Sequence, residues 1–278
     1  MPFVDDSGTK LWYQITGQKH GQPLVLSGGF GLLENQYDFV RELLGRHFQV
    51  IDWNYRGAGQ SDRAWPGGVY HLDTWVDDLE KILGHLRVET AVLWGTSTGS
   101  LITIRYAARY PSRVHAVITY PMFKIDPGFK NAFESITRIG EIFGYEALAA
   151  LTSWMGVASE NLFQPKWTAI AKWESEKFRK NFSLGTLAAT LAIVSASDLS
   201  ADLDRIKVPT LLLLGESGTL GYASAGNRAL ADEFSRRVPH ALLKVIPGSG
   251  GTYCMVEAPE ATAAAVIEFA TASRSLHR

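Results

Sequence analysis

The sequence predicts an α/β fold: a mostly parallel sheet flanked by helices, with an inserted helical lid. Three observations lead to this prediction. Apolar runs of strand length alternate along the chain with segments of helical periodicity, as in βαβ units. Several runs, such as VLWG and TLLLLG, are apolar at every position, which is typical of strands covered on both faces. From residue 121 to about residue 205 the alternation stops, and only helical stretches follow.

The composition excludes several classes of protein. The chain has 278 residues, 46% of them hydrophobic and 20% charged, and its 27 Lys and Arg nearly balance its 28 Asp and Glu. This length suits one large α/β domain or two small ones, and the composition is not that of a disordered or fibrous protein. A net charge of −1 gives no electrostatic footprint for nucleic acid or an anionic membrane, so we expect neither partner.

Cysteine and histidine usage predicts no metal and no organic cofactor. The single cysteine, Cys254, excludes an internal disulfide and a cysteine-based zinc or iron–sulfur site. The seven histidines are dispersed, and no additional glycine-rich phosphate motif is present. The N-terminal MPFVDDSGTK lacks the positive charge and apolar run of a signal peptide, and no apolar stretch reaches the about 20 residues of a membrane span. We therefore expect a soluble cytoplasmic protein, whose oligomeric state the sequence leaves open.

The expected elements follow the chain in order. Residues 11–16 come after an Asp-Ser-Gly turn, which favours an antiparallel hairpin at the sheet edge. The remaining strands are expected at residues 23–27, 48–53, 90–94, 114–120, 210–214 and 241–246. Helical periodicity spans residues 72–86, 100–110, 225–237 and 259–272. Pro259 suits the first turn of the last helix, where Glu260 complements the helix dipole.

The segment 121–205 is expected to form a helical lid on a core made of residues 1–120 and 206–278. Two roles are open for its many aromatic residues: packing between the helices, and lining an apolar ligand pocket at the junction with the core. These residues are Phe123, Phe129, Phe133, Phe143, Tyr145, Trp154, Phe163, Trp167, Trp173, Phe178 and Phe182. Because both roles can hold together, the segment favours an apolar or aromatic small-molecule ligand.

One short motif carries chemistry. Gly95-Thr96-Ser97-Thr98-Gly99 follows the expected strand 90–94 and opens the expected helix 100–110, which is the strand–turn–helix context that G-x-S-x-G requires. So sharp a turn strains the serine backbone and leaves no room for side chains at the flanking positions, which explains the glycines. Ser97 is therefore expected at the carboxyl end of the sheet, beside the amide donors of a helix N-terminus.

This motif and four further blocks resemble the capped branch of the α/β-hydrolase fold superfamily over nearly the whole chain. The blocks stand in the family's order: SGGFG at 27–31, RGAGQSD at 56–62, GTSTG at 95–99, VPTL to GE at 208–216, and PGSG with EAPE at 247–260. Residues 27–31 resemble the family's oxyanion loop, and we call them the oxyanion loop. The resemblance implies that Ser97 is the catalytic serine. It also implies an oxyanion hole formed by the N–H groups of Thr98 and of Gly29, with Phe30 as the alternative to Gly29.

Two departures from the family pattern remove both partners of the serine. Relatives carry an aspartate two residues after the Gly215-Glu216 pair, where this chain has Gly218. Relatives read G-x-G-H in the last loop, where this chain has glycine at position 251 and no histidine before Glu257. A serine hydroxyl is a weak nucleophile without an adjacent base, so the resemblance implies an incomplete triad.

Other residues are open as replacements for the missing partners. Of the histidines, at positions 20, 47, 71, 85, 115, 240 and 277, only His71 is expected on the correct edge of the sheet. Tyr253 and Cys254 occupy the emptied loop, and either can face Ser97. The candidate acids are Glu216, Glu34 just beyond the oxyanion loop, and Asp126 at the entry to the lid.

Three functions are open. The first is an enzyme of altered chemistry that uses the oxyanion hole and Ser97 on an apolar carbonyl compound, for acyl transfer, cyclisation, elimination or carbon–carbon cleavage. The second is a serine ester or thioester hydrolase with a displaced base, and the third is a non-catalytic small-ligand-binding protein. Retained oxyanion donors favour the first, because such donors act without a triad. Substrate contacts are expected from Phe30, Glu34, Tyr120 and Tyr253.

Overall fold

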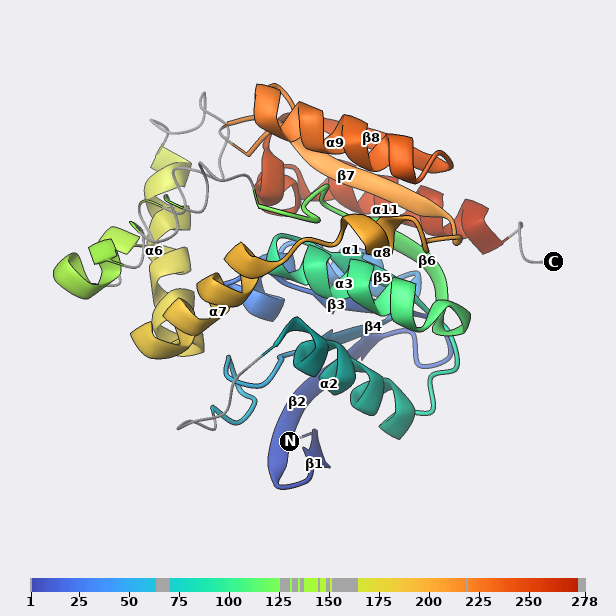
Figure 1. Cartoon of the computed structure of the whole chain (residues 1–278), viewed down its shortest axis with the longest axis horizontal. Helices are drawn as coiled ribbons and strands as arrows, with labels where there is room; N and C mark the ends of the chain where they lie inside the picture. Colours follow the sequence, from blue (N-terminus) through green and yellow to red (C-terminus); the bar gives the residue numbers. More distant parts are fainter. Residues whose placement is uncertain are drawn as a thin grey trace.

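The structure, a computed structural model, describes residues 2–63, 71–125, 131, 135, 138–144, 146–148, 151, 165–218 and 220–274. These residues build a central twisted sheet with helices on both of its faces and a helical segment beside one end (Figure 1).

The sheet of the described residues has eight strands in the order β1-β2-β4-β3-β5-β6-β7-β8. The strands are β1 (Phe3–Asp6), β2 (Thr9–Gly17), β3 (Gln22–Ser27), β4 (Phe48–Trp53), β5 (Ala91–Gly95), β6 (Val114–Thr119), β7 (Thr210–Ser217) and β8 (Ala241–Gly250). β2 pairs antiparallel with both β1 and β4, whereas all other neighbours are parallel. The mostly parallel sheet and its antiparallel edge hairpin confirm the fold class that the sequence predicts.

Two apolar layers attach the helices to the sheet. The described helices of the core are α1 (Arg41–Gly45), α2 (Leu72–His85), α3 (Thr98–Arg109), α9 (Ala225–Arg237), α10 (Cys254–Glu257) and α11 (Pro259–Arg274). Alternate strand residues face opposite sides, so Leu93 packs with α2, α3 and α9 in one layer, while Val92 packs with α1 and α11 in the other. This alternation of apolar residues explains why the strands read as continuously apolar runs.

The strand order reverses at β3, and this reversal positions the site. β3 lies between β4 and β5, and Ser27 at the end of β3 pairs with Gly95 at the end of β5. The loops that follow these two strands therefore leave the same edge of the sheet side by side. In open α/β sheets, ligands bind in the crevice at such a reversal.

The structure corrects several expected boundaries. β7 and β8 continue to Ser217 and Gly250, because their pairing resumes after an irregularity in β7. α3 begins at Thr98, since the turn that holds Ser97 leads directly into the helix. Between β3 and β4, the 3₁₀-helix η1 (Leu33–Tyr37) and α1 have no counterpart among the expected elements.

The segment expected to form the lid contains helices where the structure describes it. It contains α6 (Pro165–Asn181), α7 (Leu184–Ala196) and α8 (Ser200–Leu203), and an isolated bridge joins Lys124 to Asp198. Figure 1 shows α6 beside one end of the sheet. Asp126 and several of the aromatic residues lie outside the described residues, so the lid boundaries 121–205 stay a prediction. Within the described part of the chain, no helix is long and apolar enough to cross a membrane.

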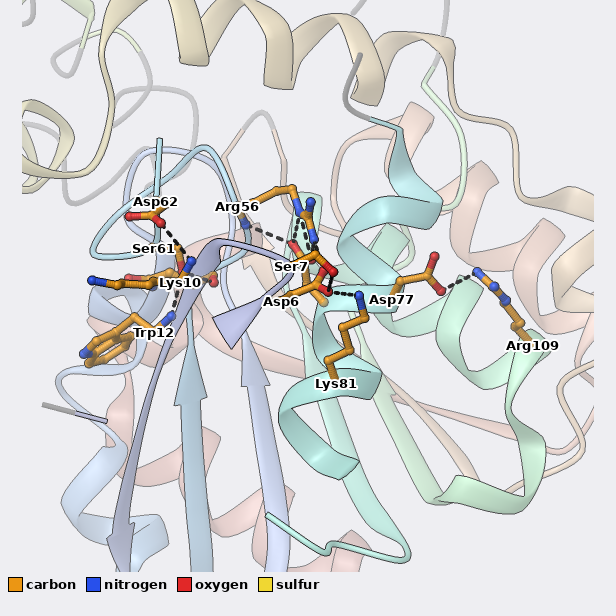
Figure 2. A network of polar contacts seen from close by, with 12 residues as sticks. Asp6, Ser7, Lys10, Trp12, Arg56, Ser61, Asp62, Asp77, Lys81 and Arg109 are labelled. Carbon is orange, nitrogen blue, oxygen red and sulfur yellow. Dashed lines mark hydrogen bonds and ion pairs between the residues drawn. The ribbon is translucent and has the colours of Figure 1, made fainter. Parts of the chain in front are cut away.

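The arginine of the RGAGQSD block fastens the edge hairpin to the core (Figure 2). The Arg56 guanidinium donates hydrogen bonds to Asp78 on α2 and to Asp6 on β1. Lys81, one turn further along α2, forms a second ion pair with Asp6. The Asp78 side chain is fully buried and that of Arg56 is one-fifth exposed, at 0% and 20%, so this arginine neutralises a buried charge.

The end of the same block pairs with the hairpin backbone. The Ser61 hydroxyl oxygen accepts the Trp12 N–H at 2.9 Å, and the Asp62 carboxylate accepts the Lys10 N–H at 2.8 Å. Figure 2 shows both contacts on the strand that forms β2. The block therefore has a structural role, which joins the hairpin, the loop after β4 and α2.

Candidate active site

Ser97 stands at the turn between β5 and α3. Its φ of 55° and ψ of −123° lie outside the regions that residues with side chains prefer. Crowding explains the flanking glycines: a Cβ on Gly99 would stand 1.7 Å from the Ser27 carbonyl oxygen, and a Cβ on Gly95 would stand 2.3 Å from the Gly99 oxygen. The surrounding structure thus enforces a strained backbone at Ser97.

The loop after β3 passes directly against Ser97. A Cβ on Gly29 would lie 2.9 Å from the Ser97 Cβ and 3.3 Å from its Oγ, so a side chain at position 29 would crowd the serine. The structure therefore brings Ser97, Gly29 and the start of α3 together. This arrangement is the one expected of an oxyanion site.

The Gly29 amide itself has a hydrogen-bond partner within the protein. The Gly29 N–H donates to the Gln36 Oε1 at 2.8 Å, and the Gly29 carbonyl accepts the Leu33 N–H at 3.0 Å. In a planar trans peptide the next N–H points away from that carbonyl, so the Phe30 N–H is directed away from Leu33. Thr98 is the first residue of α3, where an amide has no acceptor within the helix. The Gly29 N–H is thus engaged within the protein, and the oxyanion roles of Gly29, Phe30 and Thr98 stay predictions.

Gln36 links two loops that are far apart in the sequence. Its Nε2 donates to the Thr252 carbonyl at 3.0 Å, in the 3₁₀-helix η4 (Gly251–Tyr253) after β8. The residue is 3% exposed. Its side chain thus bridges the oxyanion loop and the loop in which relatives carry a histidine.

Position 251, where the resemblance places the family histidine, has no room for a side chain. A Cβ on Gly251 would stand 1.7 Å from the Leu220 carbonyl oxygen, and a Cβ on Gly215 would stand 2.3 Å from the Gly250 oxygen. The last loop and the loop after β7 therefore pack backbone against backbone. A histidine side chain at position 251 does not fit this packing.

The described histidines have other surroundings. His71 is exposed at the start of α2, the His85 ring lies 5.9 Å from that of Tyr13, and the His240 Nε2 is 2.9 Å from the Val208 carbonyl. Among the described residues, no hydrogen bond joins a histidine to the Ser97 Oγ. His277 lies outside the described residues.

Tyr253 and Cys254 are both buried in the loop after β8, the loop in which relatives carry a histidine. The Tyr253 hydroxyl donates to the carboxylate of Glu174, a fully buried residue of α6. Burial raises the pKa of the Cys254 thiol to about 12, and a thiol that stays protonated at neutral pH is a poor nucleophile. Cys254 is therefore a packing residue, and Tyr253 connects the loop to α6.

The other expected contacts also have partners within the protein. Glu34 is buried and accepts a hydrogen bond from the Asn54 side chain, and burial raises the pKa of its carboxyl. The Tyr120 hydroxyl lies 2.8 Å from both the Leu220 carbonyl and the Asn227 Oδ1. This pair of contacts gives Tyr120 a structural role between β6 and α9.

The Glu216 side chain lies at the surface. It is exposed, and its carboxylate accepts the Gly248 N–H at 3.3 Å. The contact ties the end of β7 to β8, and the expected acid role of Glu216 has no support from it.

α6 packs on the oxyanion loop. The Phe178 ring contacts the Phe30 ring edge-to-face at 5.6 Å between centroids, and it fills the space that a side chain on Gly31 would need. The Asn181 Nδ2 donates to the Gly31 and Leu32 carbonyls at 2.9 and 3.0 Å. Phe30 therefore lies between Gly29, beside Ser97, and the helix α6.

Sequence reasoning missed three residues of this site: Gln36, Glu174 and Asn181. Gln36 belongs to the polar triplet Glu34-Asn35-Gln36, which reads as a surface loop although every member is buried. Its position directly after the oxyanion loop is the one signal that could have found it. Glu174 and Asn181 lie on a helix whose orientation the sequence does not reveal.

A metal site has no support in the described part of the chain. No group of three or more His, Cys, Asp and Glu side chains gathers there in a way that could hold an ion.

Comparison with known proteins gives a consistent result. The sequence model described as alpha/beta hydrolase fold matches residues 24–129. The AB hydrolase superfamily protein YisY of Bacillus subtilis (strain 168) is 32% identical over 221 residues, which cover 77% of this chain and 76% of that protein. The cis-3-alkyl-4-alkyloxetan-2-one decarboxylase of Shewanella oneidensis is 28% identical over 239 residues, or 77% of this chain and 72% of that protein.

A solved structure agrees with these relatives in fold. The enol-lactonase from Burkholderia xenovorans LB400 is similar with a TM-score of 0.81 and 22% sequence identity, over 97% of this chain and 100% of that chain.

Proposed function

The chain belongs to the α/β-hydrolase fold family, and on this premise we propose that it is an enzyme of altered chemistry. Its substrate is a small apolar or aromatic carbonyl compound that binds between the core and the helical lid. The N–H groups of Phe30 and Thr98 polarise the substrate carbonyl, and the Ser97 hydroxyl lies beside it. No Ser-His-Asp triad takes part.

One observation carries this proposal: position 251, where relatives read histidine, has no room for a side chain, while the strained serine is present. The Cβ of any residue at position 251 would clash with the Leu220 carbonyl oxygen. Ser97, which packs against Gly29, nevertheless keeps the strained φ of 55°. Such backbone strain costs about 1–3 kcal/mol and clusters at functional sites. A protein that only packs or binds a ligand gains nothing from keeping it.

The site suits reactions that need charge stabilisation more than a base. Preorganised N–H donors stabilise negative charge as it develops on a carbonyl oxygen. A β-keto acid that loses CO2 from the carbon beside its ketone leaves the electron pair of the broken carbon–carbon bond on the substrate, which places the charge on the carbonyl oxygen as an enolate. A proton from water then completes the reaction at that carbon. The Ser97 hydroxyl then donates a hydrogen bond and does not attack. The Shewanella oneidensis relative, named as a decarboxylase, supports a reaction other than hydrolysis.

The test separates altered chemistry from serine hydrolysis. The full chain is incubated with a fluorophosphonate probe and weighed as the intact protein, and p-nitrophenyl butyrate turnover is measured for wild type, Ser97→Ala and the exposed control Ser112→Ala. We expect no labelling at Ser97 and less than a tenfold loss of turnover in Ser97→Ala, because an oxyanion hole and binding alone leave roughly 10³–10⁴-fold acceleration over water.

The same protein is then offered a panel of apolar β-keto acids and enolisable ketones, with products followed by mass spectrometry. Formation of a cleaved or eliminated product supports the proposal. Probe labelling of Ser97 together with loss of ester turnover in Ser97→Ala contradicts it and favours a hydrolase with a displaced base. A panel member that binds and is recovered unchanged, with no turnover of any compound, favours a ligand-binding protein.

A further inference from the structure

Gln36 makes two hydrogen bonds that fix the orientation of its amide. The Gly29 N–H is a donor, so the Gln36 atom facing it at 2.8 Å is the oxygen. The Thr252 carbonyl is an acceptor, so the atom facing it at 3.0 Å is the nitrogen. The opposite orientation would place donor against donor and acceptor against acceptor, and the burial of Gln36 leaves no water to relieve that clash.

This amide and the Ser97 hydroxyl both lie close to Gly29. The Gln36 Oε1 and the Ser97 Oγ stand 3.0 and 3.3 Å from the same point, the place of a Cβ on Gly29. The Gly29 N–H is held by Gln36 and the Gly29 carbonyl by Leu33, so both peptide planes at Gly29 are fixed. The direction of the Phe30 N–H follows from these planes.

We infer that Gln36 is a positioning residue of the oxyanion hole, an inference that rests on the proposed function. It takes the Gly29 N–H away from the substrate and fixes the loop so that the Phe30 N–H faces the carbonyl oxygen. It also ties this loop to η4, which lies in the loop where relatives carry a histidine. Without Gln36 the Gly29 peptide is free to rotate, and the Phe30 N–H is no longer held toward the carbonyl oxygen.

Replacement of Gln36 by glutamate tests this through the protonation state. In the Gln36→Glu variant, the protonated carboxyl repeats the native pattern, because its carbonyl accepts from Gly29 and its hydroxyl donates to Thr252. The ionised form places a carboxylate against the Thr252 carbonyl, which disrupts the bridge. Burial and that carbonyl both disfavour the ionised form, so the pKa of the new carboxyl rises above its usual value. Activity of Gln36→Glu is therefore present at low pH and lost as pH rises through that pKa.

The experiment measures p-nitrophenyl butyrate turnover from pH 5 to pH 9 for wild type, Gln36→Glu, Gln36→Met and Gln14→Glu. Gln14 is exposed on β2 and controls for the added charge. We expect Gln36→Met to lower kcat about 10²-fold at every pH with little change in KM, since losing one oxyanion donor costs about 10²–10³ in kcat. Gln36→Glu should match wild type at the acidic end and Gln36→Met at the basic end.

Binding of p-nitrophenolate measures the affinity of the oxyanion hole for an anion without turnover. The shift in the absorption of the phenolate monitors this binding. The inference predicts the same order and the same pH dependence for phenolate affinity as for kcat. Circular dichroism at each pH checks that the variants are folded. If Gln36→Met does not fold, the reversible pH dependence of kcat in Gln36→Glu still tests the positioning role of Gln36.

The outcomes are distinct. Wild-type turnover with unchanged kcat in both Gln36 variants overturns the inference alone. A loss in Gln36→Glu that does not vary with pH, or that falls on KM and thermal stability only, reduces Gln36 to a structural residue and also overturns it. A wild-type protein that does not turn over the ester, does not bind phenolate and converts no member of the β-keto acid and ketone panel contradicts the proposed function, and the inference fails with it.

Discussion

The strain at Ser97 is a property of one residue, and it predicts an unusual order of stabilities. Ser97→Gly and Ser97→Ala both remove the hydroxyl, but only glycine adopts a φ of 55° and ψ of −123° without steric cost. We expect Ser97→Gly to be more stable than Ser97→Ala by about 1 kcal/mol in the free energy of unfolding. Urea denaturation of both variants measures the difference.

Ser100, inside α3, provides the matched control for this pair. It is buried and helical, and its hydroxyl donates to the Gly95 carbonyl. In a helix interior, glycine is about 1 kcal/mol less favourable than alanine, so the order should reverse at position 100. If glycine is also the less stable replacement at position 97, the strain described there is absent.

The contrast between Ser97 and Gln36 shows what sequence reveals about a residue. Ser97 lies in a local motif whose strand, turn and helix are contiguous, so its placement could be predicted. Gln36 acts through Thr252, which lies 216 residues away in the sequence, and the polar triplet around it resembles a surface loop. A residue whose role depends on so distant a partner gives no local signal.

At the scale of elements, the attachment of α6 depends on a side-chain amide. The Asn181 Nδ2 donates to two buried carbonyls. Asn181→Asp turns the donor into a carboxylate that faces both oxygens, whereas Asn181→Ala leaves them unpaired at about 1–3 kcal/mol. We expect Asn181→Asp to be the more destabilising change at pH 7, and to recover as its carboxyl protonates at lower pH. Urea denaturation with amide exchange of residues 165–181 measures both effects.

Asn131→Asp, at an exposed position, controls for the added charge. This change should leave the free energy of unfolding within about 0.5 kcal/mol of wild type, as surface substitutions do. Equal stability of Asn181→Asp and Asn181→Ala at pH 7 would show that Asn181 is not the donor that holds α6 on the oxyanion loop.

The elements themselves were largely predictable, for a physical reason. Residues 48–53 and 225–237 coincide with β4 and α9, because the first is apolar on both faces and the second has a clear helical period. The ends of β7 and β8 were missed because Glu216, Pro247 and Ser249 carry no apolar signal, although their backbones still belong to paired strands.

At the scale of the whole molecule, Arg56 holds three separate elements together. Its partner Asp78 is fully buried, and removing one member of a buried ion pair costs about 3–5 kcal/mol. We therefore expect Arg56→Met to lower the free energy of unfolding by about 3 kcal/mol. Urea denaturation measures this change, and the midpoint urea concentration should fall accordingly. Arg46→Met removes an exposed pair with Glu42 and should change stability by less than about 1 kcal/mol. Similar losses in the two variants would contradict the assigned role of Arg56.

The same network predicts part of the acid sensitivity of the fold. The Lys81 hydrogen bond, together with that of Arg56, lowers the pKa of Asp6 below its usual value. A carboxyl with a depressed native pKa contributes stability above its unfolded pKa of about 3.9, and the contribution is lost as pH falls through the native value.

Asp6→Asn tests this contribution. The wild type should lose stability more steeply than Asp6→Asn as pH falls from 5 to 3, because only the wild type loses the ionised carboxylate. Urea midpoints at half-unit pH intervals measure the slopes. Parallel slopes would show that Asp6 does not contribute to acid sensitivity.

The contact between Gly251 and Leu220 limits the paths by which this chain can evolve. A histidine at position 251 clashes with a backbone carbonyl, so a single substitution cannot restore one there. The neighbouring loop would have to move first, and that movement alone brings no catalytic advantage on which selection could act. A side chain at position 251 is therefore accommodated only after an insertion or deletion that shifts both loops together.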